Sequence, residues 1–143
     1  MEIFKLSIEC LTGENLEDKF LRIIKIPSNF TLKDLHSIIQ DLTDFDDDHL
    51  AGYYISNSWH GRKKWLTLGK DLVFDDEEAW QSPLSNYFPL PKKKKLYYQF
   101  DFGDSWIFEI RKKGGSLKPA PNERYPVLIH EEGPKPEQYR YDD

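Results

Sequence analysis

The chain has 143 residues, 38% of them hydrophobic and 15% aromatic, so it can form one domain with a sizeable core. Its net charge of −5 disfavours general nucleic-acid binding, and its single cysteine excludes an intrachain disulfide and a cysteine-based zinc cluster. No apolar run approaches the roughly 20 residues of a membrane span, and the N-terminus has no apolar signal segment, so we expect a cytoplasmic protein without a membrane partner.

The first part of the chain predicts two paired strands. Apolar and polar residues alternate over 2–10, which is typical of a half-buried strand, and Cys10 on the apolar side is expected to be buried and inert. The apolar, β-branched segment 20–26 predicts a second strand, which ends at Pro27 because proline cannot donate to a ladder. The turn-like segment between them predicts an antiparallel hairpin.

A helix is predicted over 31–43. Thr31 is a suitable N-cap, and Asp34 occupies the third helical position of a capping box. Apolar residues follow at helical spacing and form one stripe: Leu32, Leu35, Ile39 and Leu42. We expect this stripe to pack across a sheet.

The middle of the chain predicts a strand at 50–56 and a return strand at 65–68. A short helix is predicted at 83–88, because Ser82 can cap it and Pro83 suits the first helical position.

The stretch YYQFDFGDSWIFEI predicts a second hairpin. A three-residue loop at 103–105 would pair Phe102 with Trp106 and Phe100 with Phe108, which makes one face wholly apolar. A two-residue loop would mix polar and apolar residues on both faces. We therefore expect the odd-length loop, with its aromatic face toward the core.

These elements predict one α+β domain over 1–143, with a mixed or antiparallel sheet of hairpins and one main helix packed across it. From about 114 the chain is rich in proline, glycine and charge. We expect this tail to wrap the surface, apart from an apolar strand at 125–129.

The hairpin stretch resembles the signature of the Ri-plasmid open-reading-frame-three-like family. The segments RIIKIP, TLKDLHSIIQ, DHL and YPVLIHEEGPKPEQY extend the resemblance over about 1–139. It implies a compact α+β domain but no demonstrated activity, although some members carry resolvase-like labels. Many relatives have a His where this chain has Phe108, so a metal or proton-transfer role of that His does not apply here.

Two carboxylates flank the glycine of the hairpin loop. Asp101 and Asp104 could form an acid/base pair or bind a metal, but acceptance of backbone N–H bonds in the turn is the favoured interpretation. A zinc site built from His36, His49, His130 and an Asp would require the fold to bring them together, so no metal or cofactor is predicted. The predicted functional surface consists of Asp101, Asp104, Trp106, Glu109 and Tyr139.

The chain has two basic runs. One comprises Lys92, Lys93, Lys94 and Lys95, and the other Arg62, Lys63 and Lys64. With the nearby rings of Trp59, Trp65, Tyr97 and Tyr98, they could form a stacking and phosphate-binding surface. Solvated loops that keep sheet edges from associating are the favoured alternative.

Three functional hypotheses remain open. The leading one is a non-enzymatic binding or interaction module, with a protein as one candidate partner, that uses the hairpin and the GPKPEQY tail. The second is a nucleic-acid-associated protein of mobile elements that uses the basic runs. The third is a metal-dependent or acid/base hydrolase that uses Asp101 and Asp104.

Overall fold

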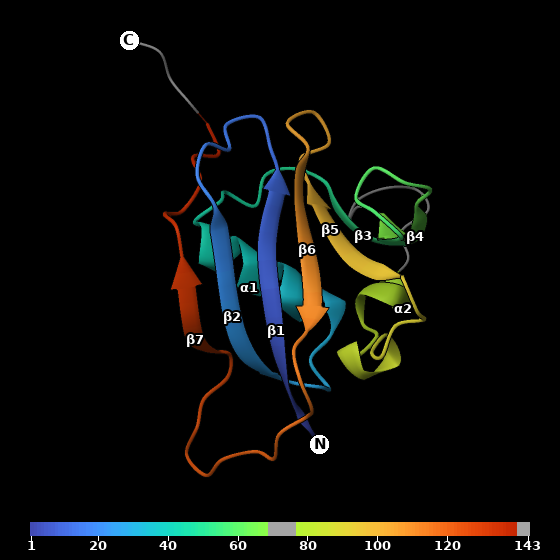
Figure 1. Cartoon of the computed structure of the whole chain (residues 1–143), viewed down its shortest axis with the longest axis vertical. Coiled ribbons are helices and arrows are strands. Elements are labelled where there is room, and N and C mark those ends of the chain that lie inside the picture. Colours follow the sequence, from blue (N-terminus) through green and yellow to red (C-terminus); the bar gives the residue numbers. More distant parts are fainter. Residues whose placement is uncertain (69–76, 140–143) are drawn as a thin grey trace.

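The computed structural model describes residues 1–68 and 77–139. Within these residues, seven strands form one antiparallel sheet in the order β4-β3-β5-β6-β1-β2-β7 (Figure 1). The strands are β1 (Ile3–Thr12), β2 (Phe20–Pro27), β3 (Ala51–Ser56), β4 (Lys64–Leu68), β5 (Lys95–Phe100), β6 (Trp106–Lys112) and β7 (Val127–Glu132). The helices are α1 (Leu32–Thr43), α2 (Glu77–Trp80) and the 3₁₀ helix η1 (Leu84–Asn86). The α+β prediction is confirmed. None of the described helices has the length and apolar character that a membrane crossing requires.

Helix α1 crosses one face of the sheet (Figure 1). It begins after Thr31, whose hydroxyl accepts a hydrogen bond from the backbone N–H of Asp34 at 3.1 Å. The Asp34 carboxylate in turn accepts one from the backbone N–H of Thr31 at 2.9 Å. The predicted capping box is therefore confirmed, and such a cap contributes about 1 kcal/mol to helix stability.

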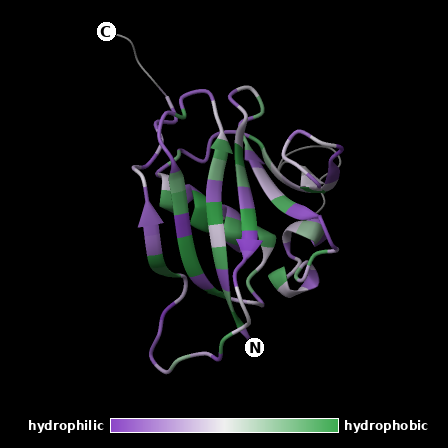
Figure 2. Ribbon diagram, in the orientation of Figure 1, coloured by the Kyte–Doolittle hydropathy of each residue, from purple (hydrophilic) through white to green (hydrophobic). Residues whose placement is uncertain are grey.

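The main core lies between α1 and the sheet, and aromatic residues of the second hairpin contribute much of it. The side chains of Phe100, Trp106 and Phe108 are fully buried there. Figure 2 shows hydrophobic and hydrophilic residues alternating along the central strands, as expected when one face of each strand packs against the core. Cys10 is also buried, and desolvation by this burial raises the pKa of its thiol to about 12. The prediction that Cys10 is buried is confirmed.

The register of the second hairpin differs from the prediction. Phe100 lies opposite Trp106, and Tyr98 opposite Phe108, so the loop spans five residues instead of three. Asp101 and Ser105 both adopt left-handed backbone conformations, with φ of 58° and 53°. Because the error is two residues, each side chain keeps its predicted face.

The predicted helix at 83–88 is shorter in the structure. Only η1 forms, and Pro83 precedes it without a side-chain cap. The Ser82 hydroxyl donates to the carbonyl of Glu78 at 3.1 Å, so it completes the last turn of α2. A serine before a proline is therefore not sufficient evidence for an N-cap.

The tail returns to the sheet as β7, which pairs with β2 and starts two residues later than predicted. Arg22 of β2 fixes this return, because its guanidinium donates to the carbonyls of Glu132 and Gly133 at 2.9 and 3.0 Å. That guanidinium is buried and lies 4.2 Å from the centroid of the Phe20 ring. A single buried arginine thus links the C-terminal strand to the core.

Candidate functional site

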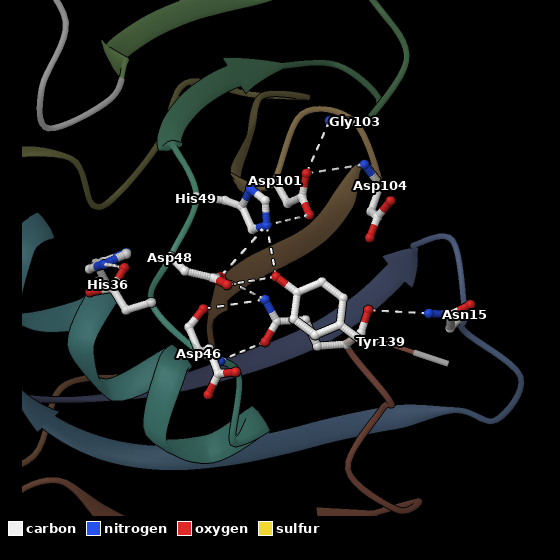
Figure 3. Close-up of polar contacts among 11 residues, drawn as sticks. Asn15, His36, Asp46, Asp48, His49, Asp101, Gly103, Asp104 and Tyr139 are labelled. Carbon is white, nitrogen blue, oxygen red and sulfur yellow. Dashed lines mark hydrogen bonds and ion pairs between the residues drawn. The ribbon is translucent and has the colours of Figure 1, made fainter. Parts of the chain in front are cut away.

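Three segments that are far apart in the sequence meet at one end of the sheet (Figure 3). They are the connector after α1, the hairpin loop at 101–105 and the end of the tail. We call the contacting side chains the bend cluster, which consists of Asp48, His49, Asp101, Gln138 and Tyr139.

The Nε2 atom of His49 lies at the centre of the bend cluster. It is 2.8 Å from the hydroxyl of Tyr139, 3.4 Å from Oδ2 of Asp101 and 3.7 Å from Oδ1 of Asp48. The imidazole side chain is 38% exposed. This imidazole therefore faces two carboxylates and one phenol hydroxyl, which link the connector to the loop and the tail.

Asp101 has a second role in the hairpin loop. Its Oδ1 atom accepts hydrogen bonds from the backbone N–H groups of Gly103 and Asp104 at 3.2 and 3.3 Å. These are the turn contacts that the sequence favoured. The other oxygen faces His49, which the sequence did not predict, because the connector and the loop are about fifty residues apart.

The pKa values of two carboxylates in this region, those of Asp104 and Asp48, are shifted in opposite directions. Partial burial, together with the neighbouring carboxylates of Asp101 and Glu14, raises the pKa of Asp104. The hydroxyl of Tyr139 lowers the pKa of Asp48, to which it donates a hydrogen bond at 2.6 Å. The same bond raises the pKa of Tyr139. Deprotonation is therefore disfavoured at Asp104 and favoured at Asp48.

Gln138 anchors the tail to the connector. Its amide N–H group donates to the Asp46 carbonyl at 3.2 Å and to the Asp48 carboxylate at 3.0 Å, and its amide oxygen accepts from the Asp46 backbone N–H at 2.5 Å. Asn15 donates to the Gln138 carbonyl at 3.1 Å (Figure 3). Sequence reasoning selected the GPKPEQY segment but missed Gln138 as the residue that anchors it.

The other histidines do not join this cluster. His36 is fully buried and lies between the hydroxyl of Tyr98, 2.6 Å from its Nδ1, and the carboxylate of Asp47, 3.0 Å from its Nε2. His130 lies on β7, next to Glu132. Among the described residues, no group of three or more His, Cys, Asp and Glu side chains is arranged to hold a metal ion. The hypothetical zinc site from three histidines is not assembled.

The five residues of the predicted functional surface do not form one surface. Asp101, Asp104 and Tyr139 lie at or beside the bend cluster. Trp106 is buried on the helix side of the sheet, with its ring 4.9 Å from that of Phe45. The prediction is wrong for Trp106, because its strand position places it in the main core.

Glu109 is also separate from the bend cluster. It lies on the opposite face of β6, where its side chain is buried. The guanidinium of Arg111 donates to Glu109 at 2.5 Å, and the amine of Lys95 lies 3.6 Å away. Glu109 therefore pairs with the basic side chains of Arg111 and Lys95, and it does not join the carboxylates of the bend cluster.

The basic residues line two adjoining grooves. The first has a volume of about 390 Å³, and its apolar lining residues are Phe88, Leu90 and Ile110. Its cationic lining consists of Lys93, Lys94, Lys95, Arg111 and Lys112. The second has a volume of about 330 Å³ and is lined by Ile55, Arg62, Lys63, Lys64, Pro91 and Lys94.

Lys94 lines both grooves, so they share a wall. Together they contain eight of the chain's 20 Lys and Arg residues, and no Asp or Glu is among the described residues that line them. We call them the basic grooves. Their cations come from three separate stretches of the chain, of which sequence reasoning linked two.

Only two of the four rings proposed for stacking are accessible. Tyr98 is buried in the main core, and Tyr97 is buried on the other face, where it stacks on Tyr54. Trp59 and Trp65 are partly exposed.

Comparisons with known proteins agree with the resemblance seen in the sequence. A comparison with curated proteins found no match. Among solved structures, the chain is similar to a protein of unknown function, MM3350, from Methanosarcina mazei Go1. The identity is 26% and the TM-score 0.66, over 91% of this chain and 68% of the other. The family model of the plasmid pRiA4b ORF-3-like proteins matches residues 2–138, so the chain belongs to this family.

Proposed function

We propose that this chain is a non-enzymatic binding module that binds nucleic acid through the basic grooves. One observation carries the proposal: three basic segments that are distant in the sequence line two grooves that share Lys94. Concave surfaces are where ligands are most often bound, and clustered cations are what a phosphate backbone requires.

The overall charge of −5 does not oppose this proposal, because the charges are segregated. Carboxylates of Asp46, Asp48, Asp101 and Asp104 gather near the bend cluster, whereas the basic grooves hold eight cations. Local potential, not net charge, determines where an anionic polymer first makes contact.

Several of these cations are available to a ligand. Within the described part of the chain, the amines of Lys93 and Lys94 make no ion pair with a carboxylate. Lys95 and Arg111 share the buried carboxylate of Glu109, which holds their side chains in place. Among the described residues, the grooves thus combine amines that have no carboxylate partner with cations of fixed position.

We assign the bend cluster a structural role in this proposal. Its polar atoms satisfy one another, and Gln138 and Tyr139 use them to attach the tail to the connector.

The test is the salt dependence of binding to a labelled 12-nucleotide DNA, measured by fluorescence anisotropy. With about four phosphate contacts to a single strand, we expect affinity to fall roughly 50-fold between 50 and 200 mM salt. The double variant Lys63→Gln/Lys94→Gln should lose on the order of 10-fold in affinity at 0.1 M salt and show a shallower salt slope.

The matched control is Lys33→Gln/Lys118→Gln, which changes the net charge equally at two exposed positions outside the grooves. This control should bind like the unmodified protein. Absence of binding at low salt, or equal losses in both double variants, would refute the proposal.

A further inference from the structure

We infer that the nucleic acid bound by this chain is single-stranded, and that Trp65 and Phe102 form a platform on which its bases stack. The inference rests on the proposed function of the basic grooves. Bases in a duplex are stacked on each other and present only their edges, whereas a single strand offers their faces to aromatic side chains.

The platform is a pair of exposed rings from two distant segments. Trp65 lies on edge strand β4, and Phe102 lies in the loop between β5 and β6. Their ring centroids are 5.7 Å apart at an interplanar angle of 42°. The two residues are 36% and 37% exposed, so each offers ring surface to a ligand.

Buried rings pack against Trp65, which in turn contacts Phe102. Trp65 contacts Tyr54, with centroids 4.9 Å apart, and Tyr54 stacks on Tyr97 at 5.1 Å and 23°. Tyr54 and Tyr97 are fully buried on the face of the sheet that the main core does not use. Trp65 is thus held by packing before a ligand arrives, which reduces the entropy lost on binding.

Trp65 is linked to the second basic groove through Tyr54 and Lys63. The amine of Lys63, which lines that groove, lies 5.2 Å from the centroid of the Tyr54 ring. A strand whose phosphates lie in the groove can therefore place successive bases toward Trp65 and Phe102. Proteins that bind single strands combine a cationic groove along the phosphate backbone with aromatic side chains on which the bases stack.

The experiment compares three probes: a 12-nucleotide oligo(dT), a duplex of the same length and inorganic polyphosphate. We expect oligo(dT) to bind more tightly than the duplex and to quench tryptophan fluorescence. Phe102→Ala and Trp65→Leu should each weaken oligo(dT) binding about tenfold and leave polyphosphate binding unchanged. Ile129→Ala, at an exposed apolar position on β7, should change neither.

Thermal unfolding followed by circular dichroism confirms that each variant is folded at the assay temperature. Equal affinity for duplex and single strand, or ring variants that bind oligo(dT) normally, would overturn the inference and leave the basic grooves in place. Self-association that both ring variants abolish would also overturn it, because the rings would then contact a second copy. Failure of all three probes to bind at low salt would instead refute the proposed function.

Discussion

The role of Asp101 can be separated into a backbone and a side-chain component. Its φ of 58° is a left-handed conformation that Asn and Gly adopt readily and Ala does not. Its carboxylate, on a side chain that is 9% exposed, accepts two backbone N–H bonds in the loop. Asp101→Asn retains both components, Asp101→Gly retains only the conformation, and Asp101→Ala retains neither.

The expected losses in unfolding free energy follow from these components. A left-handed conformation costs Ala roughly 1–2 kcal/mol. Each lost hydrogen bond costs roughly 0.5–1.5 kcal/mol. We therefore expect losses of about 2–5 kcal/mol for Asp101→Ala, about 1–3 kcal/mol for Asp101→Gly and less than about 1 kcal/mol for Asp101→Asn.

Urea unfolding followed by tryptophan fluorescence measures these losses, provided that the slope with urea is the same for all variants. The Asn variant also removes the negative charge that faces His49. If it destabilised the protein as much as the Ala variant, the charge of Asp101 would matter more than its hydrogen bonds. The reasoning from the backbone conformation and the two loop hydrogen bonds would then be wrong.

Two further predictions concern neighbouring positions. Gly13→Ala should lower the unfolding free energy by roughly 1–3 kcal/mol, because its new Cβ atom would overlap the buried Trp106 ring. Gly115→Ala, whose Cβ would meet nothing within 4 Å, should change it little, and similar melting temperatures for the two variants would contradict this reasoning. Asp104→Asn should stabilise the protein at pH 7, because the raised pKa of Asp104 in the folded state means that its deprotonation opposes folding. The stability that comes from protonation of Asp104 is present below its unfolded pKa and is lost as the pH rises through its folded pKa. The stabilisation by Asp104→Asn should therefore vanish at about pH 3. A stabilisation that did not depend on pH would show that the raised pKa of Asp104 is not its cause.

The sequence alone determined the local elements and the faces of the strands. The capping box of α1, the end of β2 at Pro27 and the aromatic core face of β5 and β6 depend on residues that are close together in the chain. Periodicity and hydrogen bonds of short range act within such segments, so they can be read from a single sequence. The family resemblance was also visible at this level, and the family model bears it out.

Only the tertiary structure decided the hairpin register, because a shift of two residues leaves every side chain on its predicted face. It also decided which distant groups meet. His49 contacts Asp101 and Tyr139, and Arg111 joins Lys94 in a groove, because the strand order places their segments side by side. Hydrophobic patterns specify which face of a strand is buried but not which strand is its neighbour, so the convergence of charged groups becomes visible only in the folded chain.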